Sequence, residues 1–284
     1  MRCNIIGAGR LGKNIAYALS TAQIIDLRYV CNRHLDNAIQ ACQSIGYGTP
    51  ISSLTELPQV DITWITCNDD SIESIVTFLT QYPILKPESI VVHCSGVLSS
   101  SLLAPLRSQG CSIASFHPLK SFRTGYLDAN VFRQVDCVLE GDSKAIDWLS
   151  HSFSQIGAQL ININEDAKII YHAAATIASN YLVTLAATSE ELLIKAGIPP
   201  VQSKNMICKL MQGTIDNLKQ TQHIADSLTG PLMRGDLKTL ELHLNELQNP
   251  TLAKLYKAAG LATIPLCRLT KDQVQNIKNL FEKE

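Results

Sequence analysis

The chain has 284 residues, which is enough for about two domains and a sizeable hydrophobic core. Its composition, 46% hydrophobic and 17% charged, is typical of a globular protein and excludes a disordered chain. With 24 basic and 25 acidic residues and a net charge of −1, the charge balance favours neither nucleic acid nor an anionic membrane surface as a partner.

The nine cysteines are scattered along the chain, and no CxxC pair occurs. Several lie in apolar runs, where a free cysteine behaves as a small hydrophobic residue. This pattern indicates a reducing compartment, with neither a disulfide framework nor a zinc site, and the histidines show no metal-ligand spacing. The first expected strand begins so near the first residue that we expect no signal peptide. Together with the cysteine pattern, this predicts a cytoplasmic protein. Because neither the cysteines nor the histidines have metal-ligand spacing, we expect no metal.

Up to about residue 163, short apolar runs alternate with helical stretches. The expected strands are Cys3–Ile6, Leu27–Cys31, Ile62–Thr66, Ile90–His93, Ser112–Phe116, Asp136–Leu139 and Leu160–Ile163. The expected helices include Leu11–Ser20, Leu35–Ser44, Ser71–Gln81 and Lys144–Gln155. Continuously apolar strands separated by helices predict a parallel sheet covered on both faces. Residues 1–163 are therefore expected to form an α/β domain of the Rossmann type, with a doubly wound sheet.

A glycine-rich loop follows the first expected strand and opens a helix, which is the context that a dinucleotide-binding GxGxxG requires. Gly7 permits a tight turn, Gly9 lets the backbone approach a pyrophosphate, and Gly12 lets helix and strand pack closely. The helix N-terminus would present free N–H groups to the phosphates. The alternative is a glycine-rich turn without a ligand. The expected phosphate-binding residues are Gly7, Ala8, Gly9, Arg10, Leu11 and Gly12.

The end of the second strand distinguishes the two nicotinamide cofactors. NAD-binding domains place Asp or Glu there, about 20 residues after the loop, to bind the ribose hydroxyls. Here Asn32, Arg33 and His34 follow the strand, and none of them is a carboxylate. Because an arginine can pair with a 2′-phosphate in bidentate fashion, we expect NADP (NADPH) rather than NAD. The alternative is that Arg33 is a solvated loop residue.

From residue 164 onward we find no convincing strand. Helices are expected over approximately 165–196, 199–221, 236–247, 249–263 and 270–283, separated by Gly and Pro breakers. Residues 164–284 therefore predict an all-helical second domain. The stretch Ile169–Ser189 carries no charged residue and approaches the length of a membrane span. Because it contains histidine, serine, asparagine and three threonines, we expect a central buried helix and no membrane.

Several short motifs carry a family resemblance. They are His93-Cys94-Ser95-Gly96, Ser115-Phe116-His117-Pro118-Leu119-Lys120-Ser121-Phe122, Tyr171-His172-Ala173-Ala174-Ala175, Ser179-Asn180-Tyr181-Leu182, Leu228-Thr229-Gly230-Pro231 and Arg234-Gly235-Asp236. With them the chain resembles a bacterial family of Rossmann-like proteins that carry a C-terminal DUF2520 domain. The N-terminal half is similar to the NADP-binding domain of pyrroline-5-carboxylate reductase, coenzyme F420-dependent NADP oxidoreductase and β-hydroxyacid dehydrogenases.

The resemblance implies a helical C-terminal domain like that of 6-phosphogluconate dehydrogenase, a homodimer, and a substrate cleft between the domains beside the nicotinamide. It also implies that Cys67 and Asn68 lie in the loop that flanks the cofactor. Ser95 and Gly96 match the segment that holds the substrate carboxylate in β-hydroxyacid dehydrogenases. Lys168 matches their catalytic lysine, and His172 stands where they have an asparagine.

The residues also allow structural interpretations. Ser95 and Gly96 would equally suit a helix N-cap and turn, and His117, on a rigid loop before Pro118, would suit either substrate contact or a structural role. Lys168 and His172 share a helix face, because they are four residues apart. A desolvated lysine can act as acid or base, but Lys168 could instead be a surface residue at a helix start.

Arg234 could clamp an anionic substrate, or its loop could be purely structural. Asn180 is a further expected substrate-binding residue, although it is rotated by about 120° from Lys168 on the helix. The leading hypothesis is an NADP(H)-dependent oxidoreductase that moves a hydride to or from a C=O or C=N of a small anionic substrate. Ser95, His117, Lys168 and His172 are its expected catalytic residues. The alternatives are a non-catalytic NADP-binding regulatory or assembly protein and a cofactor-free scaffold.

Overall fold

The computed structural model describes residues 1–283 and divides into two compact units. The first unit is Met1–Ala178 and the second begins at Ser179. The sequence predicted a domain boundary at residue 164, where the helices begin. The first unit extends beyond this position, because it also holds the beginning of the long helix α5 (Lys168–Lys195).

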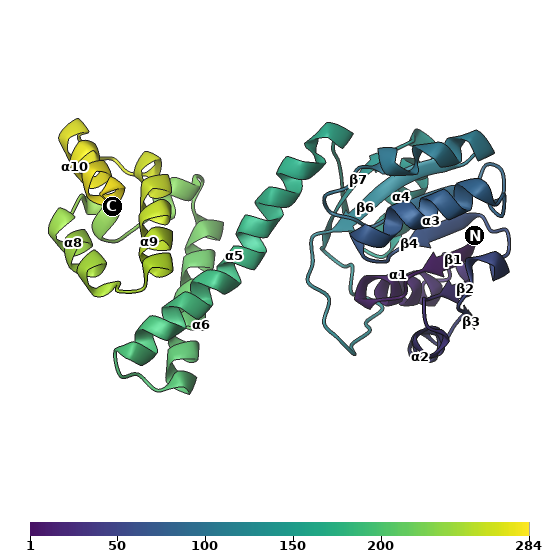
Figure 1. Cartoon of the computed structure of the whole chain (residues 1–284), viewed down its shortest axis with the longest axis horizontal. Coiled ribbons are helices and arrows are strands. Elements are labelled where there is room, and N and C mark those ends of the chain that lie inside the picture. The colour runs from purple at the N-terminus through teal and green to yellow at the C-terminus, as the bar shows by residue number, and fades with distance from the viewer. Residues whose placement is uncertain (284) are drawn as a thin grey trace. The chain divides into compact units, whose positions relative to one another are not determined.

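The first unit is an α/β sandwich around an eight-stranded sheet (Figure 1). The strands are β1 (Arg2–Ile6), β2 (Asp26–Cys31), β3 (Thr49–Ile51), β4 (Ile62–Ile65), β5 (Ile90–His93), β6 (Ser112–Pro118), β7 (Asp136–Gly141) and β8 (Gln159–Asn162). Their order is β3-β2-β1-β4-β5-β6-β7-β8, and β1 to β6 are parallel. This order confirms the predicted doubly wound Rossmann fold, whose strand order reverses beside β1.

Two hydrophobic cores, one on each face of the sheet, hold this unit together. The helices α1 (Arg10–Thr21), α2 (Leu35–Ile45) and α4 (Ser143–Gln155) contribute to one core, in which Trp64 packs against Phe116 with ring centroids 5.6 Å apart. The helix α3 (Asp69–Gln81) and the 3₁₀ segment Ser100–Gln109 contribute to the other. Successive β1 residues point to opposite cores, as the alternation of side chains along a strand requires.

Two features of the sheet differ from the sequence prediction. The short edge strand β3 was not predicted, because its three residues include a proline and carry little periodicity. The strand β7 runs antiparallel to β6, with Ser115 opposite Glu140. A purely parallel sheet was expected, because hydrophobic pattern alone does not give the direction of a strand.

The second unit is helical in its described residues, as predicted. It contains the rest of α5, then α6 (Pro200–Gln220), α7 (Pro231–Arg234), α8 (Leu237–Glu246), α9 (Pro250–Thr263) and α10 (Lys271–Glu282). A small core of Leu240, Ile264, Ile277 and Phe281 joins the last three helices. Thr270 and Gln273 form a capping box that fixes the start of α10.

Helix α5 departs from the prediction of a buried central helix. Within the single chain Lys168 is its only buried residue, and large apolar side chains such as Ile170 (71% exposed) and Val183 (69%) are open. The helical stretch Glu165–Lys195 contains an 18-residue window with a mean hydropathy of 1.3, so by length and composition alone it could cross a membrane. The prediction of burial is therefore wrong for the isolated chain.

Candidate functional site

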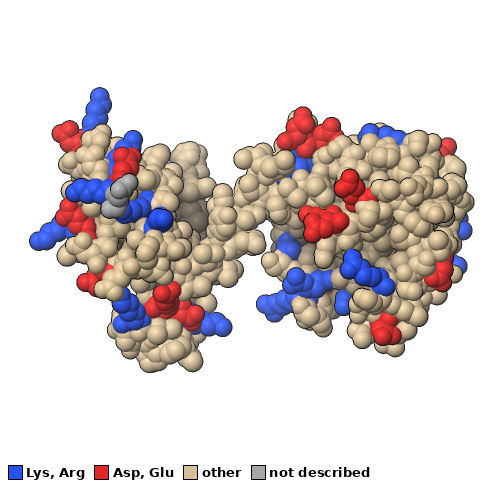
Figure 2. Space-filling view, in the orientation of Figure 1, with Lys and Arg blue, Asp and Glu red and all other residues tan. Residues whose placement is uncertain are grey.

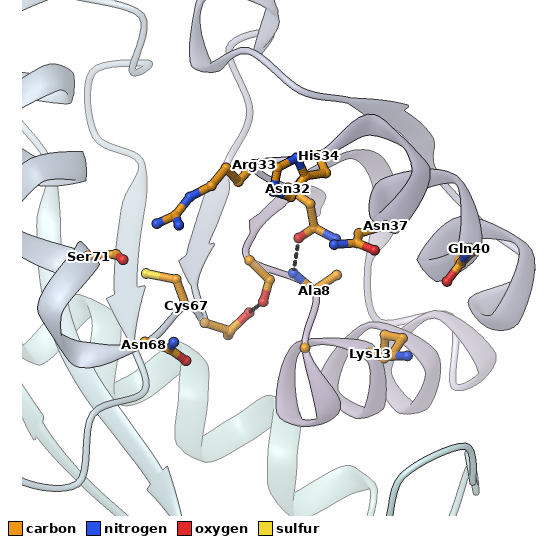
Figure 3. A pocket seen from close by; sticks show the side chains of 13 residues that line it. Ala8, Lys13, Asn32, Arg33, His34, Asn37, Gln40, Cys67, Asn68 and Ser71 are labelled. Atoms are coloured by element: carbon orange, nitrogen blue, oxygen red, sulfur yellow. Dashed lines mark hydrogen bonds between the residues drawn. The ribbon is translucent and has the colours of Figure 1, made fainter.

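A pocket of about 490 Å³ opens at the carboxyl ends of β1, β2 and β4 (Figure 3). In a doubly wound sheet this edge is where ligands bind. Thirteen residues line the pocket. They are Gly7, Ala8, Gly9, Lys13, Asn32, Arg33, His34, Asn37, Gln40, Thr66, Cys67, Asn68 and Ser71.

The glycines of the loop have the conformations and contacts that the motif requires. Gly7 has a φ of +90°, and a Cβ there would lie 2.6 Å from the Cys67 backbone nitrogen. A Cβ on Gly12 would collide with Thr66, so this glycine allows α1 to pack on β4. A Cβ on Gly9 would meet nothing within 4 Å, so at this position the backbone is open to an approaching group. The loop therefore has the shape of a phosphate cradle.

The backbone donors of the loop are partly committed and partly free. Ala8 donates its N–H to Asn32 Oδ1 at 2.7 Å, which ties the loop to the end of β2. Gly9 is the N-cap of α1 and provides no side-chain cap. The first N–H groups of α1 therefore have no side-chain acceptor, and together with the positive end of the helix dipole they favour an anion.

The charge of the pocket is positive. Arg33 and Lys13 both line it, and none of its described lining residues is Asp or Glu. Figure 3 shows the Arg33 side chain extending across the pocket from the end of β2 toward α3, whereas Lys13 projects from α1. Arg33 forms no ion pair within residues 1–283. These residues fit a dinucleotide with an additional phosphate on its adenosine ribose.

Most predicted cofactor residues meet in this pocket. Gly7, Ala8, Gly9, Asn32, Arg33, Cys67 and Asn68 line it, whereas Arg10, Leu11 and Gly12 are not among the lining residues. Sequence reasoning missed Lys13 and the pair Asn37 and Gln40. Asn37 and Gln40 are three residues apart on α2, and this spacing on a helix directly after the expected ribose-binding segment was a usable signal.

A second group of polar residues lies along β5, β6 and the start of α5, and we call Ser95, Ser115, His117, Lys168, Tyr171 and His172 the Lys–His cluster. All six belong to the first unit. Lys168 is only 1% exposed, so the interpretation of it as a surface residue is wrong. Its Nζ donates to the Ser95 carbonyl oxygen at 2.9 Å and to Ser115 Oγ at 2.6 Å.

The surroundings of Lys168 are closed and polar. Burial lowers the pKa of Lys168, whereas the negative charge of Glu140 acts to raise it. Glu140 is itself buried and accepts hydrogen bonds from the Ser100 backbone N–H at 2.8 Å and from Ser100 Oγ at 2.6 Å. The sequence did not indicate Glu140, Ser100 or Ser115, because their proximity depends on the pairing of β6 with β7.

Ser95 is buried, and its side chain is already engaged. Ser95 Oγ accepts hydrogen bonds from Val97 N at 3.2 Å and from Leu98 N at 3.0 Å, which is the turn-and-cap arrangement weighed from the sequence. His93 supports the same turn, because its Nδ1 accepts from the Ser95 N–H at 3.2 Å. Burial lowers the pKa of His93 to about 4. The geometry thus gives Ser95 a structural task, and substrate binding by Ser95 stays a prediction.

His117 and His172 approach each other over Gly96. Their ring centroids are 5.6 Å apart, and a Cβ on Gly96 would lie 2.9 Å from His117 Nε2 and closer still to His172 Nδ1. His117 Nδ1 is hydrogen-bonded to the Tyr171 hydroxyl at 2.7 Å. Within residues 1–283, the buried atom His172 Nδ1 has no hydrogen-bond partner. Gly96 therefore lets both imidazole rings pack directly against its backbone, and any side chain at this position would displace them.

The protonation states of His117 and Tyr171 follow from their environment. Burial, together with the nearby Lys168 and His172, lowers the pKa of His117 to about 4. Burial raises the pKa of Tyr171 to about 12. At neutral pH His117 is therefore uncharged and Tyr171 keeps its proton, so together they can relay a proton.

The other two expected substrate residues, Asn180 and Arg234, belong to the second unit. Asn180 lies on α5 and Arg234 at the end of the short helix α7, and both are exposed. Their roles in substrate binding stay predictions.

Comparison with known proteins places both parts of the chain. Residues 1–118 match the family model of a Rossmann-like domain, and residues 135–263 match a domain of unknown function, DUF2520. No curated protein is similar enough in sequence to count as a relative.

Several solved structures share the fold over almost the whole chain. A Bacteroides fragilis protein described as a candidate NADP oxidoreductase is 19% identical, with a TM-score of 0.76 over 93% of this chain and 98% of its own. The protein TM1727 of Thermotoga maritima is 26% identical, with a TM-score of 0.71 over 93% and 97% of the two chains. A 1-pyrroline-5-carboxylate reductase of Streptococcus pyogenes is 15% identical, with a TM-score of 0.63 over 93% and 98%.

Proposed function

The chain pairs a Rossmann-like domain with a DUF2520 domain, and on this premise we propose that it is an NADP(H)-dependent oxidoreductase. It would transfer a hydride to or from a C=O or C=N group of a small anionic substrate. The similar fold of proteins whose names refer to NADP or to pyrroline-5-carboxylate reduction supports this class of reaction.

One observation carries the proposal: the pocket at the carboxyl ends of β1 and β2 combines an open glycine cradle with Arg33 and Lys13 and has no carboxylate among its described lining residues. A carboxylate at the end of β2 would bind ribose hydroxyls and repel a 2′-phosphate. Arg33 offers that phosphate a planar pair of donors. The pocket therefore favours NADP over NAD.

When bound, the nicotinamide supplies the hydride chemistry, and the protein supplies position and electrostatics. The first N–H groups of α1 would hold the pyrophosphate, and Arg33 would hold the 2′-phosphate. Asn32 keeps the loop in its binding shape through its hydrogen bond to Ala8. Gly96 follows β5, and His117 is the last residue but one of β6, so both lie at the same sheet edge as the glycine loop. His172 lies in the second turn of α5.

We assign the proton transfer to His117. If the Tyr171 hydroxyl is the donor of this hydrogen bond, His117 Nδ1 is the acceptor, and the proton of the ring is on Nε2, the atom nearest to Gly96. His117 Nε2 donates this proton to the substrate oxygen or nitrogen, and Nδ1 takes the proton of Tyr171 in return. Because the raised pKa of Tyr171 disfavours its anion, the partly exposed hydroxyl takes a proton from water in the same step. The His172 ring, whose centroid is 5.6 Å from that of His117, packs edge-on against it and helps to orient it.

Lys168 acts as a positioning residue in this scheme. Its Nζ is enclosed and bonded to the Ser95 carbonyl and Ser115 Oγ, so it fixes the ends of β5 and β6 relative to α5. His172 lies one turn further along α5, so Lys168 also fixes the ring that faces Gly96.

A titration of NADPH and NADH tests the cofactor assignment. We expect wild-type protein to bind NADPH at least about tenfold more tightly than NADH, since a charge-assisted hydrogen bond contributes about 1.5–3 kcal/mol. Arg33→Gln should weaken NADPH binding by about ten- to a hundredfold and leave NADH binding unchanged. Calorimetry measures all four affinities.

Arg28→Gln is the matched control, because Arg28 also lies on β2 but pairs with Asp26 and is not among the residues that line the pocket. Equal losses of NADPH and NADH affinity in Arg33→Gln would contradict the role of Arg33. No binding of either nucleotide would reject the proposed function altogether. Binding without turnover of keto acids, aldehydes and cyclic imines would favour a regulatory NADP-binding protein.

We further propose that the protein is a homodimer in which a second copy covers α5. This helix of 28 residues carries no charged side chain between Ile169 and Ser189, and a helix with so long an apolar stretch is normally enclosed. Its exposed side chains include Ile169, Ile177 and Val183. A monomer by light scattering without detergent would contradict this assignment.

The nine cysteines are free, in keeping with a proposed cytoplasmic location.

A further inference from the structure

A second cavity, of about 290 Å³, lies beside the dinucleotide pocket on the outer side of α1. Helix α1 contributes Arg10, Lys13 and Asn14 to it. Ser44 from the end of α2 and residues 123–127 from the connection between β6 and β7 complete the wall. Lys13 lines both cavities, so they adjoin each other.

The wall of this cavity is strongly cationic. Arg10, Lys13 and Arg123 all line it, and no carboxylate occurs among its described lining residues. Within residues 1–283 none of these three side chains forms an ion pair or a hydrogen bond to a protein acceptor. Figure 2 shows a gathering of Lys and Arg over α1 and the β6–β7 connection of the first unit. Three unpaired cations around one hollow repel each other unless an anion joins them.

The β6–β7 connection is built to present Arg123. Phe122 and Leu127 pack against the hydrophobic core on either side of it, whereas Arg123, Thr124, Gly125 and Tyr126 are exposed. Lys120 Nζ donates to the Val131 carbonyl oxygen at 2.9 Å, which closes the base of the connection. Gly125, two residues after the arginine, has a φ of +74°, which allows a tight turn there. The segment is therefore anchored at both ends and holds its charge over α1.

We propose that Arg10, Lys13 and Arg123 form a second anion site, separate from the dinucleotide pocket, for the phosphate group of a small phosphorylated molecule. A phosphate monoester carries nearly two negative charges and three acceptor oxygens, which matches two guanidinium groups and one ammonium. The volume is just below the usual range of about 300–1,000 Å³ for small-molecule sites, so the ligand is small. Ser44, Thr124 and Tyr126 provide hydroxyl groups for the remainder of it.

Binding of glycerol 3-phosphate in the presence of saturating NADPH tests this proposal. We expect calorimetry to detect binding to wild-type protein, and we expect Arg123→Gln to weaken it by about tenfold or more, the loss typical of one charge-assisted contact. NADPH affinity should stay unchanged in Arg123→Gln. Lys13→Gln should weaken both ligands, because Lys13 is shared by the two cavities.

Arg28→Gln again serves as the control, since it removes one positive charge elsewhere on the first unit. An equal loss of phosphate binding in Arg28→Gln would show a non-specific charge effect and overturn the proposal, as would the absence of binding to wild type. Equal weakening of NADPH and glycerol 3-phosphate by Arg123→Gln would assign the cavity to the dinucleotide itself. Phosphate binding in a protein that fails to bind NADPH would reject the proposed function and leave this site standing.

Discussion

The two polar regions of the first unit are built in opposite ways. The dinucleotide pocket is open, consists largely of backbone and short loop segments, and carries cations without protein partners. The Lys–His cluster is mostly closed, and its lysine donates hydrogen bonds to the Ser95 carbonyl, just after β5, and to Ser115 on β6. The cations and free N–H groups of the first region therefore favour an anionic ligand as their partner. The second provides most of its own partners, and both of its histidine rings pack against Gly96.

This contrast separates binding from positioning. Unpaired charge at an open surface is stabilised by a ligand, so mutations there change affinity more than folding. Enclosed charge is stabilised only by its neighbours, so mutations there change the free energy of unfolding first. His117 and His172 lie at the border of the closed region. Substitution of His117 should therefore change turnover more than it changes cofactor affinity or the free energy of unfolding at neutral pH.

The largest expected effect comes from His117→Gln. Because His117 Nε2 is the proposed proton donor, we expect kcat for NADPH oxidation to fall by about 10²–10⁴-fold, the range for loss of a general acid. NADPH affinity should remain that of wild type, since His117 is not among the residues that line the dinucleotide pocket. Steady-state kinetics and calorimetry measure the two quantities.

His151→Gln is the control for this substitution, because His151 is exposed on α4 and does not line either pocket. An unchanged kcat in His117→Gln would show that another group donates the proton. It would also contradict the proposed assignment of proton transfer to His117 and of positioning to Lys168. A loss of NADPH binding would show that His117 supports the fold rather than the reaction.

The two regions also differ in how far the sequence predicted them. The glycine loop could be predicted, because Gly7, Gly9 and Gly12 act through local backbone geometry that a short motif records. Arg33 followed from its position at the end of a strand. The partners of Lys168 could not be predicted, because Ser115 is 53 residues away and its neighbour Glu140 lies opposite it only through the antiparallel β6–β7 pairing. Sequence periodicity gives the faces of a strand and not its direction.

Lys168→Met is expected to have the next largest effect, on stability. The substitution retains the length of the side chain but leaves the Ser95 carbonyl without its donor and Glu140 without a nearby positive charge. We expect the free energy of unfolding to fall by about 2–4 kcal/mol, in the range for a broken buried polar network. Urea denaturation measures this change.

The double variant Lys168→Met/Glu140→Gln sharpens the result. If the two charges stabilise each other, the double variant should lose less stability than the sum of the single losses. Strict additivity would indicate that Glu140 is stabilised by Ser100 alone. A stable Lys168→Met protein that lacks activity would return Lys168 to the catalytic role predicted from the sequence.

The last expected effect is a pH dependence of stability that arises from the closed region, and it is the smallest at neutral pH because it disappears there. Burial lowers the pKa of both His93 and His117 to about 4, whereas an unfolded histidine titrates near 6.5. As the pH falls from about 6.5 to 4, the unfolded chain binds protons that the folded chain excludes, so the free energy of unfolding decreases. The slope should approach about 1.4 kcal/mol per pH unit for each histidine in this window and vanish above it. The pKa values of the Asp61 and Asp142 carboxyl groups are also lowered, but these groups take up protons below this window, so their contribution to stability is lost only there.

Urea denaturation between pH 4.5 and 8 should therefore give a shallower slope for His93→Gln than for wild type, and an unchanged slope for His151→Gln. An equally steep slope in His93→Gln would show that the ring of His93 takes up a proton in the folded protein, and the region around Lys168 would then be more open to water than its contacts indicate.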